Sequence, residues 1–322
     1  MNGVGLQMIP KFISESYQIF IPKFIIEPLF QFRCYVGFKF LRRNIINYYS
    51  RLPTSQITGE HKEVLKYLKQ NPVSVFPYPF TAKYSPENVE VLFDEQLRFH
   101  YVLFEDKRLY FKRSWSESKI KEYYYSLQLE QDINSPHRYL TDDFFVETND
   151  VVVDAGAAEG NFALSVVDNA RKIYLFETDK EWIEALRVTF EPWKEKVVII
   201  NKFLSDKNDE KDITLDYFFE KGNDISFLKI DVDGGEEQLL NGCGKILSSN
   251  QPLKVALCAY HKQNDEADFI RLLKSKGFEI SCSKGYMIFI YDSQLKAPYL
   301  LKPPYLRRGI IRAKKRFYKF TN

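Results

Sequence analysis

The chain has 322 residues, of which 45% are hydrophobic and 16% aromatic, and this composition excludes an intrinsically disordered or collagen-like protein. Its four cysteines lie far apart in the sequence, which argues against a disulfide scaffold or a zinc ribbon and favours a reducing, cytoplasmic location. The net charge is +3, but residues 1–51 carry seven basic and two acidic residues and residues 293–322 carry nine basic and no acidic ones, so the body between them is acidic. An acidic body does not suit nucleic-acid binding.

Residues 1–134 predict an accessory region of helices with a small β element. Pro10, Pro22 and Pro28 interrupt the aromatic N-terminal segment and should limit any helix there to a few turns. Farther along, the pattern predicts a helix over 57–70, strands over 89–93, 98–104 and 108–111, and a helix over 116–131. No uncharged apolar run is long enough to cross a membrane.

From Asp150 onward, apolar strands alternate with helices, which is typical of a parallel α/β sheet. Strands are predicted over 151–154, 172–176, 197–200, 225–230 and 253–259, with helices over 161–168 and 181–190. Segments 278–282 and 287–291 flank Ser283-Lys284-Gly285 and predict a terminal antiparallel hairpin. We therefore expect an α/β domain over 135–292, followed by a basic tail over 293–322.

The turn after the first strand of this domain is the most informative stretch. A buried strand ends at Asp154, and Gly156 and Gly160 allow a tight turn that a ligand can approach closely. Nicotinamide cofactors need Gly-x-Gly-x-x-Gly, whereas this turn has Ala158 at the middle glycine and an acid before the first one. An acid there repels a pyrophosphate but suits a cationic nucleoside. The turn therefore favours S-adenosyl-L-methionine over NAD, with a plain tight turn as the alternative.

The next two strands extend this predicted cofactor site. Glu177 ends the second strand 23 residues after Asp154, where a carboxylate can accept hydrogen bonds from both ribose hydroxyls. Asp206 follows the third strand, where it can accept from the adenine amine. A solvated carboxylate is the alternative for both residues. The full predicted set for cofactor binding is Asp154, Gly156, Ala157, Gly160, Glu177, Thr178, Ser205, Asp206 and Asp231.

The fourth strand carries FLKIDVDGGE over residues 227–236, followed by Leu-Asn-Gly. This run resembles the signature of the FkbM-type methyltransferases, Lys-Ile-Asp-Val-Glu-Gly-Ala-Glu followed by Leu-x-Gly. Thr-Leu-Asp over 214–216 and Phe-Glu over 176–177 with Asp179 resemble further family features, so that the resemblance covers about residues 135–292. Asp233, Gly235 and Thr178 replace the family's Glu, Ala and Pro, and Glu159 adds an acid whose side chain should face solvent or substrate.

The resemblance implies a class I methyltransferase fold and S-adenosylmethionine-dependent methylation of hydroxyl oxygens, often on sugars. Asp231, Glu236 and His261 form the predicted catalytic set, because they follow the fourth and fifth strands at the sheet edge where ligands bind. His261 is the expected base, since the ordinary pKa of histidine lies near working pH, and Asp231 should line the junction of cofactor and substrate. A surface histidine, or a divalent cation held by His261 and the carboxylates, is the alternative, and no metal is included in the set. The other three histidines, including His137, should be structural or exposed.

The sequence thus predicts an O-methyltransferase that acts on a sugar in a glycan or glycoside. A non-catalytic glycan- or partner-binding module and a nicotinamide oxidoreductase stay as alternatives. The intact set Asp154, Gly156, Gly160 and Glu177 argues against the first, and Ala158 against the second. Basic and aromatic residues at both ends of the chain suit an anionic membrane surface, which would fit a lipid-linked acceptor and peripheral membrane contact. The other interpretation, equally open, is that the N-terminal apolar residues pack on the body and that the basic tail is simply solvated. No nucleic-acid partner is expected.

Overall fold

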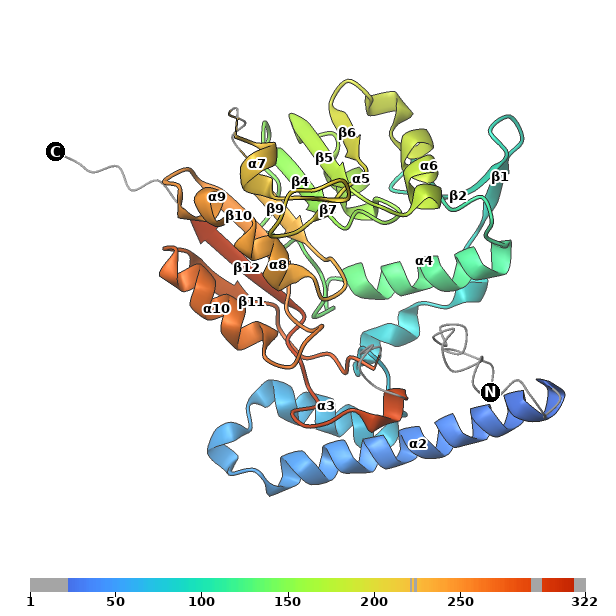
Figure 1. Cartoon of the computed structure of the whole chain (residues 1–322). Coiled ribbons are helices and arrows are strands. Elements are labelled where there is room, and N and C mark those ends of the chain that lie inside the picture. Colours follow the sequence, from blue (N-terminus) through green and yellow to red (C-terminus); the bar gives the residue numbers. More distant parts are fainter. Residues whose placement is uncertain (1–22, 221, 223–224, 291–296, 316–322) are drawn as a thin grey trace.

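The computed structural model describes residues 23–220, 222, 225–290 and 297–315, with only the backbone of residues 23–33 and 298 (Figure 1). The expectations for residues 1–22, 291–296 and 316–322 lie outside this range. Within the described part of the chain, no helix is both long enough and apolar enough to span a bilayer.

A seven-stranded sheet forms the centre of the molecule, with its strands in the order β11-β12-β10-β9-β4-β5-β6. Six strands run in the same direction, and β12, between β10 and β11, is antiparallel to both of its neighbours. All five residues of β4 are buried, as expected of a parallel strand that is covered on both faces. The predicted fold class is confirmed. The strands are β4 (Val151–Ala155), β5 (Lys172–Phe176), β6 (Val197–Ile200), β9 (Phe227–Ile230), β10 (Leu253–Cys258), β11 (Glu279–Cys282) and β12 (Ile310–Lys315).

The terminal antiparallel pair is present, but its second strand differs from the predicted one. β11 pairs with β12, not with residues 287–291. Met287 makes only an isolated bridge with Arg307, and the amide of Ile288 donates to the carbonyl of Val75 in the N-terminal region. β12 occupies the position between β10 and β11, where its apolar residues Ile310, Ile311 and Ala313 become fully buried. The predicted boundary at 292, with a tail beyond it, is therefore wrong.

Helices cover both faces of the sheet (Figure 1). Alternate residues of one strand face opposite ways, so Val152 packs in one hydrophobic cluster and Val153 in the other. The first cluster includes Phe162 of α5 and Trp182 of α6, and the second includes Leu239 of α8. The helices are α5 (Asn161–Val166), α6 (Lys180–Thr189), α7 (Leu215–Phe218), α8 (Glu236–Asn241), α9 (Gly244–Ser248) and α10 (Asp265–Ser275), and two short strands, β7 (Phe203–Leu204) and β8 (Asp212–Ile213), pair separately.

The N-terminal region contains the predicted helices and small β element, and it packs on the sheet. Its Leu41, Val64 and Phe99 belong to the same hydrophobic cluster as Val152 of β4. Residues 23–134 therefore share a core with the sheet. The elements of this region are α2 (Lys23–Arg51), α3 (Gly59–Gln70), a sheet of β1 (Leu92–Asp94), β2 (Phe99–Phe104) and β3 (Lys107–Tyr110), and α4 (Glu117–Gln131).

Helix α2 is longer than the prolines led us to expect. It has 29 residues and continues past Pro28 to Arg51, so the predicted limit of a few turns is wrong. Pro28 lies in the N-terminal part of the helix, and no further proline follows before the helix ends. Gly37 lets the ring of Tyr299, in the short helix η5 (Pro298–Leu300), pack directly on α2, since a Cβ at this position would lie 2.4 Å from the ring.

The described cations of segment 293–322 mostly point into the protein. Arg307 donates to the carbonyl oxygens of Tyr260 and His261, at 2.6 and 2.8 Å. Arg308 pairs with Glu60 at 3.0 Å. Arg312 is only 7% exposed and donates to the carbonyl of Tyr139 at 3.0 Å. These three arginines are thus engaged within the protein, whereas Lys302 of the same segment is exposed.

We expect that a chain ending at Gly309 fails to unfold cooperatively, whereas a chain ending at Lys315 melts like the full protein. The shorter chain loses β12 and with it the burial of Ile310 and Ile311, each of which contributes roughly 2–5 kcal/mol. That sum is comparable with the total stability of a typical domain, about 5–15 kcal/mol. Thermal unfolding followed by circular dichroism measures the difference. Equal melting temperatures for the two chains would show that β12 is not an integral strand.

Candidate active site

The carboxyl ends of β4, β5, β9 and β10 bring most of the predicted residues together. Gly156 and Gly160, in the turn after β4, both have a left-handed backbone, with φ of 75° and 87°. A Cβ on Gly156 would lie 1.9 Å from the carbonyl oxygen of Asp231, and one on Gly160 would lie 2.7 Å from the side chain of Leu186. Both glycines are thus required by backbone conformation and by contacts within the protein, and the turn lies directly against the end of β9.

A buried ion pair joins β4 to β9. Lys229 Nζ lies 2.9 Å from Asp154 Oδ1, and the Asp154 side chain is completely buried. The same ammonium donates to the carbonyl of Gly156 at 2.7 Å. Burial lowers the pKa of Lys229, but the carboxylates of Asp154 and Asp231 outweigh that effect and hold it above its ordinary value. Asp154 therefore positions the turn through Lys229 and offers no exposed surface to a ligand.

Glu177 is held in place at the end of β5 by three backbone amides. Oε2 accepts from the amide of Ala158 at 2.8 Å, and Oε1 accepts from the amides of Thr178 and Asp179 at 2.6 and 2.7 Å. A carboxylate has about four acceptor positions, so one position is left for a ligand hydroxyl without loss of any of these bonds. The three amides therefore hold the Glu177 carboxylate beside the turn after β4, which was predicted to bind a cofactor.

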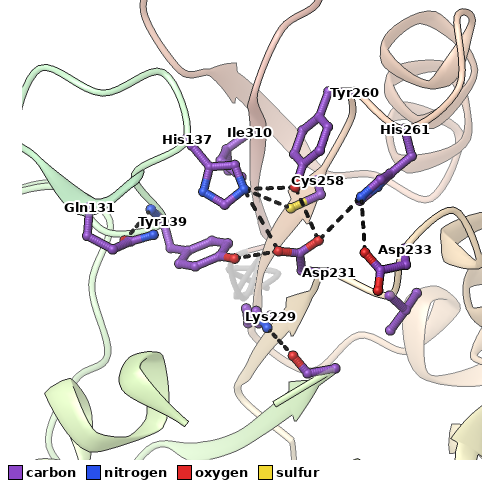
Figure 2. A network of polar contacts seen from close by, with 12 residues as sticks. Gln131, His137, Tyr139, Lys229, Asp231, Asp233, Cys258, Tyr260, His261 and Ile310 are labelled. Atoms are coloured by element: carbon purple, nitrogen blue, oxygen red, sulfur yellow. Dashed lines mark hydrogen bonds and ion pairs between the residues drawn. The ribbon is translucent and has the colours of Figure 1, made fainter. Parts of the chain in front are cut away.

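Asp231 lies at the centre of a polar network (Figure 2). Tyr139 donates to its Oδ2 at 2.7 Å and Tyr260 donates to its Oδ1 at 3.4 Å. His137 is buried and neutral at pH 7, because burial lowers its pKa to about 4, and its Nε2 lies 2.9 Å from the hydroxyl of Tyr260. Burial raises the pKa of Asp231, but the positive charge of Lys229 and the hydrogen bond from Tyr139 lower it below its ordinary value, so Asp231 stays ionised.

His261 lies among three carboxylates. Its Nδ1 is 3.0 Å from Glu236 Oε1, and its Nε2 is 3.8 Å from both Asp231 Oδ1 and Asp233 Oδ1 (Figure 2). The imidazole is only 8% exposed, and the Asp233 side chain is fully exposed. Burial lowers the pKa of His261, but the carboxylates of Glu236, Asp231 and Asp233 raise it by more than burial lowers it. The pKa of His261 is therefore above the ordinary value of histidine. His261 thus lies beside Asp231, as predicted from the strand order, and its imidazole is more basic than that of a free histidine.

Glu236 acts on this site through its neighbours. It is 1% exposed, and Oε1 accepts from the amides of Val232 and Gly234 at 3.1 and 3.2 Å while facing His261. It therefore holds the loop after β9 and the imidazole in place, which makes it a positioning residue. The ligand atoms of Asp231, Glu236 and His261 all lie within 4.8 Å of one another, and a divalent cation could be bound there. Glu236 Oε1 already accepts from two backbone amides and faces His261 Nδ1 at 3.0 Å, so this carboxylate is engaged within the protein.

Two further carboxylates approach the turn after β4 from nearby. Glu159 is 3% exposed, and Tyr123 of α4 donates to its Oε2 at 2.7 Å, so the expectation that its side chain faces solvent is wrong. Burial raises the pKa of Glu159 to about 7. Burial, Asp231 and Glu159 raise the pKa of Glu130 of α4 to about 8. The site thus has a surplus of carboxylates around Lys229.

The remaining predicted residues differ in position. The amide of Thr178 donates to Glu177 Oε1, and the amide of Ala157 donates to the carbonyl of Phe176, the residue before Glu177. Ser205 and Asp206 follow β7, and the Ser205 backbone packs on Gly242 at the end of α8. Among the described residues, no hydrogen bond or ion pair joins these two to Glu177 or Asp231. The structure therefore does not bring Ser205 and Asp206 into the network around Asp231.

Sequence reasoning assigned no role to several residues of the site. A signal existed for one of them, because a lysine within the apolar run Phe-Leu-Lys-Ile must find a buried anion, and Asp154 is its partner in the parallel register of β4 and β9. No local pattern points to the others, since they come from loops and from α4. The residues without an assigned role were Lys229, Tyr139, His137, Tyr260, Tyr123 and Glu130.

The charges of the site fit the predicted cofactor class. The carboxylates of Asp154 and Asp231 both act on one buried cation of the site, Lys229, and the resulting net negative charge suits a sulfonium and an ammonium group but repels a pyrophosphate. A cavity of about 390 Å³ lined by residues such as Asp150, Ser226 and Lys254 lies at the other edge of the sheet, where β4 and β10 begin. We place the site at the carboxyl ends, because ligands of open α/β sheets bind there.

Comparisons with known proteins agree with this placement. Residues 199–280 match the family described as Methyltransferase FkbM domain, which includes Asp231, Glu236 and His261. A search of curated proteins gave no match. The solved structures similar to the chain include methyltransferase FkbM from Methylobacillus flagellatus, at 14% identity and a TM-score of 0.43, with 60% of this chain and 54% of that chain covered. This chain thus spans about half the length of that protein.

Two other similar structures contain a cofactor or its product. Fibrillarin from Aeropyrum pernix with bound S-adenosyl-L-methionine shows 15% identity and a TM-score of 0.35, with 58% of this chain and 70% of that chain covered. A Streptococcus mutans protein in complex with SAH shows 14% identity and a TM-score of 0.37, with 53% and 91% covered. The family match falls on the segment that carries the quoted motif, and it confirms the predicted resemblance to the FkbM methyltransferases.

Proposed function

We propose that the protein methylates a hydroxyl oxygen of a sugar in a glycan or glycoside. The observation that supports this most directly is the imidazole of His261 beside the ionised carboxylate of Asp231, next to the turn after β4. Hydroxyl groups donate well to carboxylate and imidazole acceptors, whereas the surrounding carboxylates repel phosphates. These charges favour an uncharged acceptor and disfavour nucleic acid.

Each residue of the site has a separate role in the proposed reaction. Bound S-adenosylmethionine supplies an electrophilic methyl group, and the turn after β4 with Glu177 would hold it. Asp231, fixed by Tyr139 and Tyr260, orients the acceptor hydroxyl by accepting its hydrogen bond. His261 Nε2 takes the proton as the oxygen becomes more nucleophilic. Glu236 holds Nδ1 and stabilises the imidazolium that results.

Replacement of the base tests this proposal directly. We expect His261→Ala to lower kcat roughly 10²- to 10⁴-fold, because the hydroxyl loses its proton acceptor. Transfer of a labelled methyl group from S-adenosylmethionine to a panel of glycosides, with and without EDTA, measures the rate. A methyl ether survives alkali and a methyl ester does not, so the product identifies the acceptor atom. An alkali-labile product, or full turnover in the variant, would contradict the proposal.

Glu177 should contribute to cofactor affinity through the ribose. Loss of its charge-assisted hydrogen bond to a ribose hydroxyl in Glu177→Ala should weaken binding of S-adenosylhomocysteine by about 1.5–3 kcal/mol. Isothermal titration measures this effect. Because the substitution also frees three backbone amides, the 2′-deoxy analogue serves as the control. Wild type should bind the analogue more weakly than the parent compound, and the variant should bind both alike. If the wild type binds S-adenosylhomocysteine and its 2′-deoxy analogue with equal affinity, Glu177 does not act through the ribose hydroxyl.

The pH dependence of kcat should report on Glu236. His261 accepts a proton only when neutral, and its pKa is raised, so kcat should rise with pH through a value above that of an ordinary histidine. Glu236→Gln removes one of the carboxylates that raise this pKa, so the rising limb should move to lower pH. Glu237→Gln, at the exposed neighbouring residue, is the matched control and should leave the profile unchanged. An unmoved limb in Glu236→Gln would show that Glu236 does not act through His261.

A further inference from the structure

Helix α2 presents a surface that the methyltransferase site does not use. We define the α2 outer face as Tyr35, Lys39, Phe40, Arg43 and Asn47, all of which are exposed. We propose that this face docks on an anionic lipid surface. The proposal does not depend on the acceptor or on the base of the methyl-transfer reaction.

The two sides of α2 have different partners. Leu41, Ile45 and Tyr49 are buried, and they belong to the core that the helix shares with the rest of the protein. Figure 1 shows α2 along one edge of the molecule, with α3 and η5 on its inner side. The outer residues Tyr35, Lys39, Arg43 and Asn47 repeat every four positions, which places them on one stripe of a helix. The stripe is therefore separate from the surface that holds α2 to the protein.

The outer face combines exposed aromatic rings with unopposed positive charge. Tyr35 is 59% exposed and Phe40 is 60% exposed, which is high for such large apolar side chains. Lys39 lies over the ring of Tyr35 at 4.3 Å. No acidic residue occurs between positions 28 and 51, whereas five basic residues do. Interfacial helices on anionic membranes show this mixture, with rings at the headgroup level and cations near the lipid phosphates.

Charge also selects among the possible partners of this face. A second copy of the chain would bring Lys39 and Arg43 of one protomer against those of the other in a symmetric contact, and like charges would oppose each other. A partner of opposite charge avoids this repulsion. An anionic bilayer supplies such charge over a flat area, which matches a straight helix on the edge of the protein.

The proposed docking surface is one face of α2, which is a smaller part of the protein than the two basic ends of the chain considered in the sequence analysis. Arg307, Arg308 and Arg312 have partners within the protein, so the described part of the C-terminal segment leaves few cations for lipid. On α2, by contrast, Lys39 and Arg43 stay at the surface. The proposal therefore assigns membrane contact to one helix face, and it predicts that substitutions on this face alone abolish the contact.

Vesicle flotation with the full chain tests the proposal. We expect the protein to float with vesicles of phosphatidylcholine and phosphatidylserine, and not with phosphatidylcholine alone. Both Lys39→Glu/Arg43→Glu and Tyr35→Ser/Phe40→Ser should reduce the bound fraction at least tenfold. Added salt should weaken binding of the wild type, because screening shortens the reach of the charges. A wild type that does not float, or that floats equally with both vesicle types, would overturn the proposal.

Matched variants separate the α2 outer face from overall charge and overall hydrophobicity. Lys180→Glu/Arg187→Glu makes the same charge change at exposed positions of α6, which lies far from α2 in Figure 1. Phe203→Ser/Tyr217→Ser removes two rings that are 55% and 59% exposed elsewhere. Both controls should float like the wild type, and a loss equal to that of the α2 variants would overturn the proposal.

Two solution measurements complete the test. All variants should keep the wild-type melting temperature and affinity for S-adenosylhomocysteine, which shows that they are folded. Light scattering without lipid should show the same mass for the wild type and for Tyr35→Ser/Phe40→Ser. If the wild type is a dimer and this variant a monomer, the face is a contact between copies of the chain and the proposal fails.

Discussion

The buried ion pair of Lys229 and Asp154 is the interaction on which the rest of the site depends. Removal of one partner from such a pair leaves an uncompensated buried charge, at a cost of about 3–5 kcal/mol. Here the same ammonium also fixes the turn after β4 through the carbonyl of Gly156, and its charge keeps Asp231 ionised. Because the parallel register places Lys229 beside Asp154, the pairing of β4 with β9 sets both the shape of the turn and the charge of the site.

The groups around Asp231 come from segments that are far apart in the sequence. Tyr139 precedes the first strand of the large sheet, and His261 follows β10. Two arginines near the end of the described chain support these positions, because Arg312 donates to the carbonyl of Tyr139 and Arg307 to that of His261. The cations that looked like a solvated tail are thus part of the framework that holds the acceptor side of the site.

The sequence allowed prediction of those features whose cause is local. Alternating apolar strands and helices predicted the parallel sheet, and the run around Asp231 predicted the family and the approach of His261 to the carboxylates. The place of β12 could not be predicted, because residues 310–315 include three basic residues and look less like a buried strand than the apolar run 287–291. Only tertiary packing selects β12 for the sheet. Tyr139, Tyr123 and Glu130 were missed for the same reason, since no spacing rule links a loop or α4 to the strand ends that they face.

The position of β12 also constrains the order in which this protein can fold during synthesis. β12 lies between β10 and β11, although it follows both of them in the chain. Until the ribosome has released residues 310–315, β10 has an unpaired edge, and such an edge readily pairs with other chains. Closure of the sheet is therefore a late, long-range step, of the kind that makes folding slow and leaves a partly made protein open to aggregation.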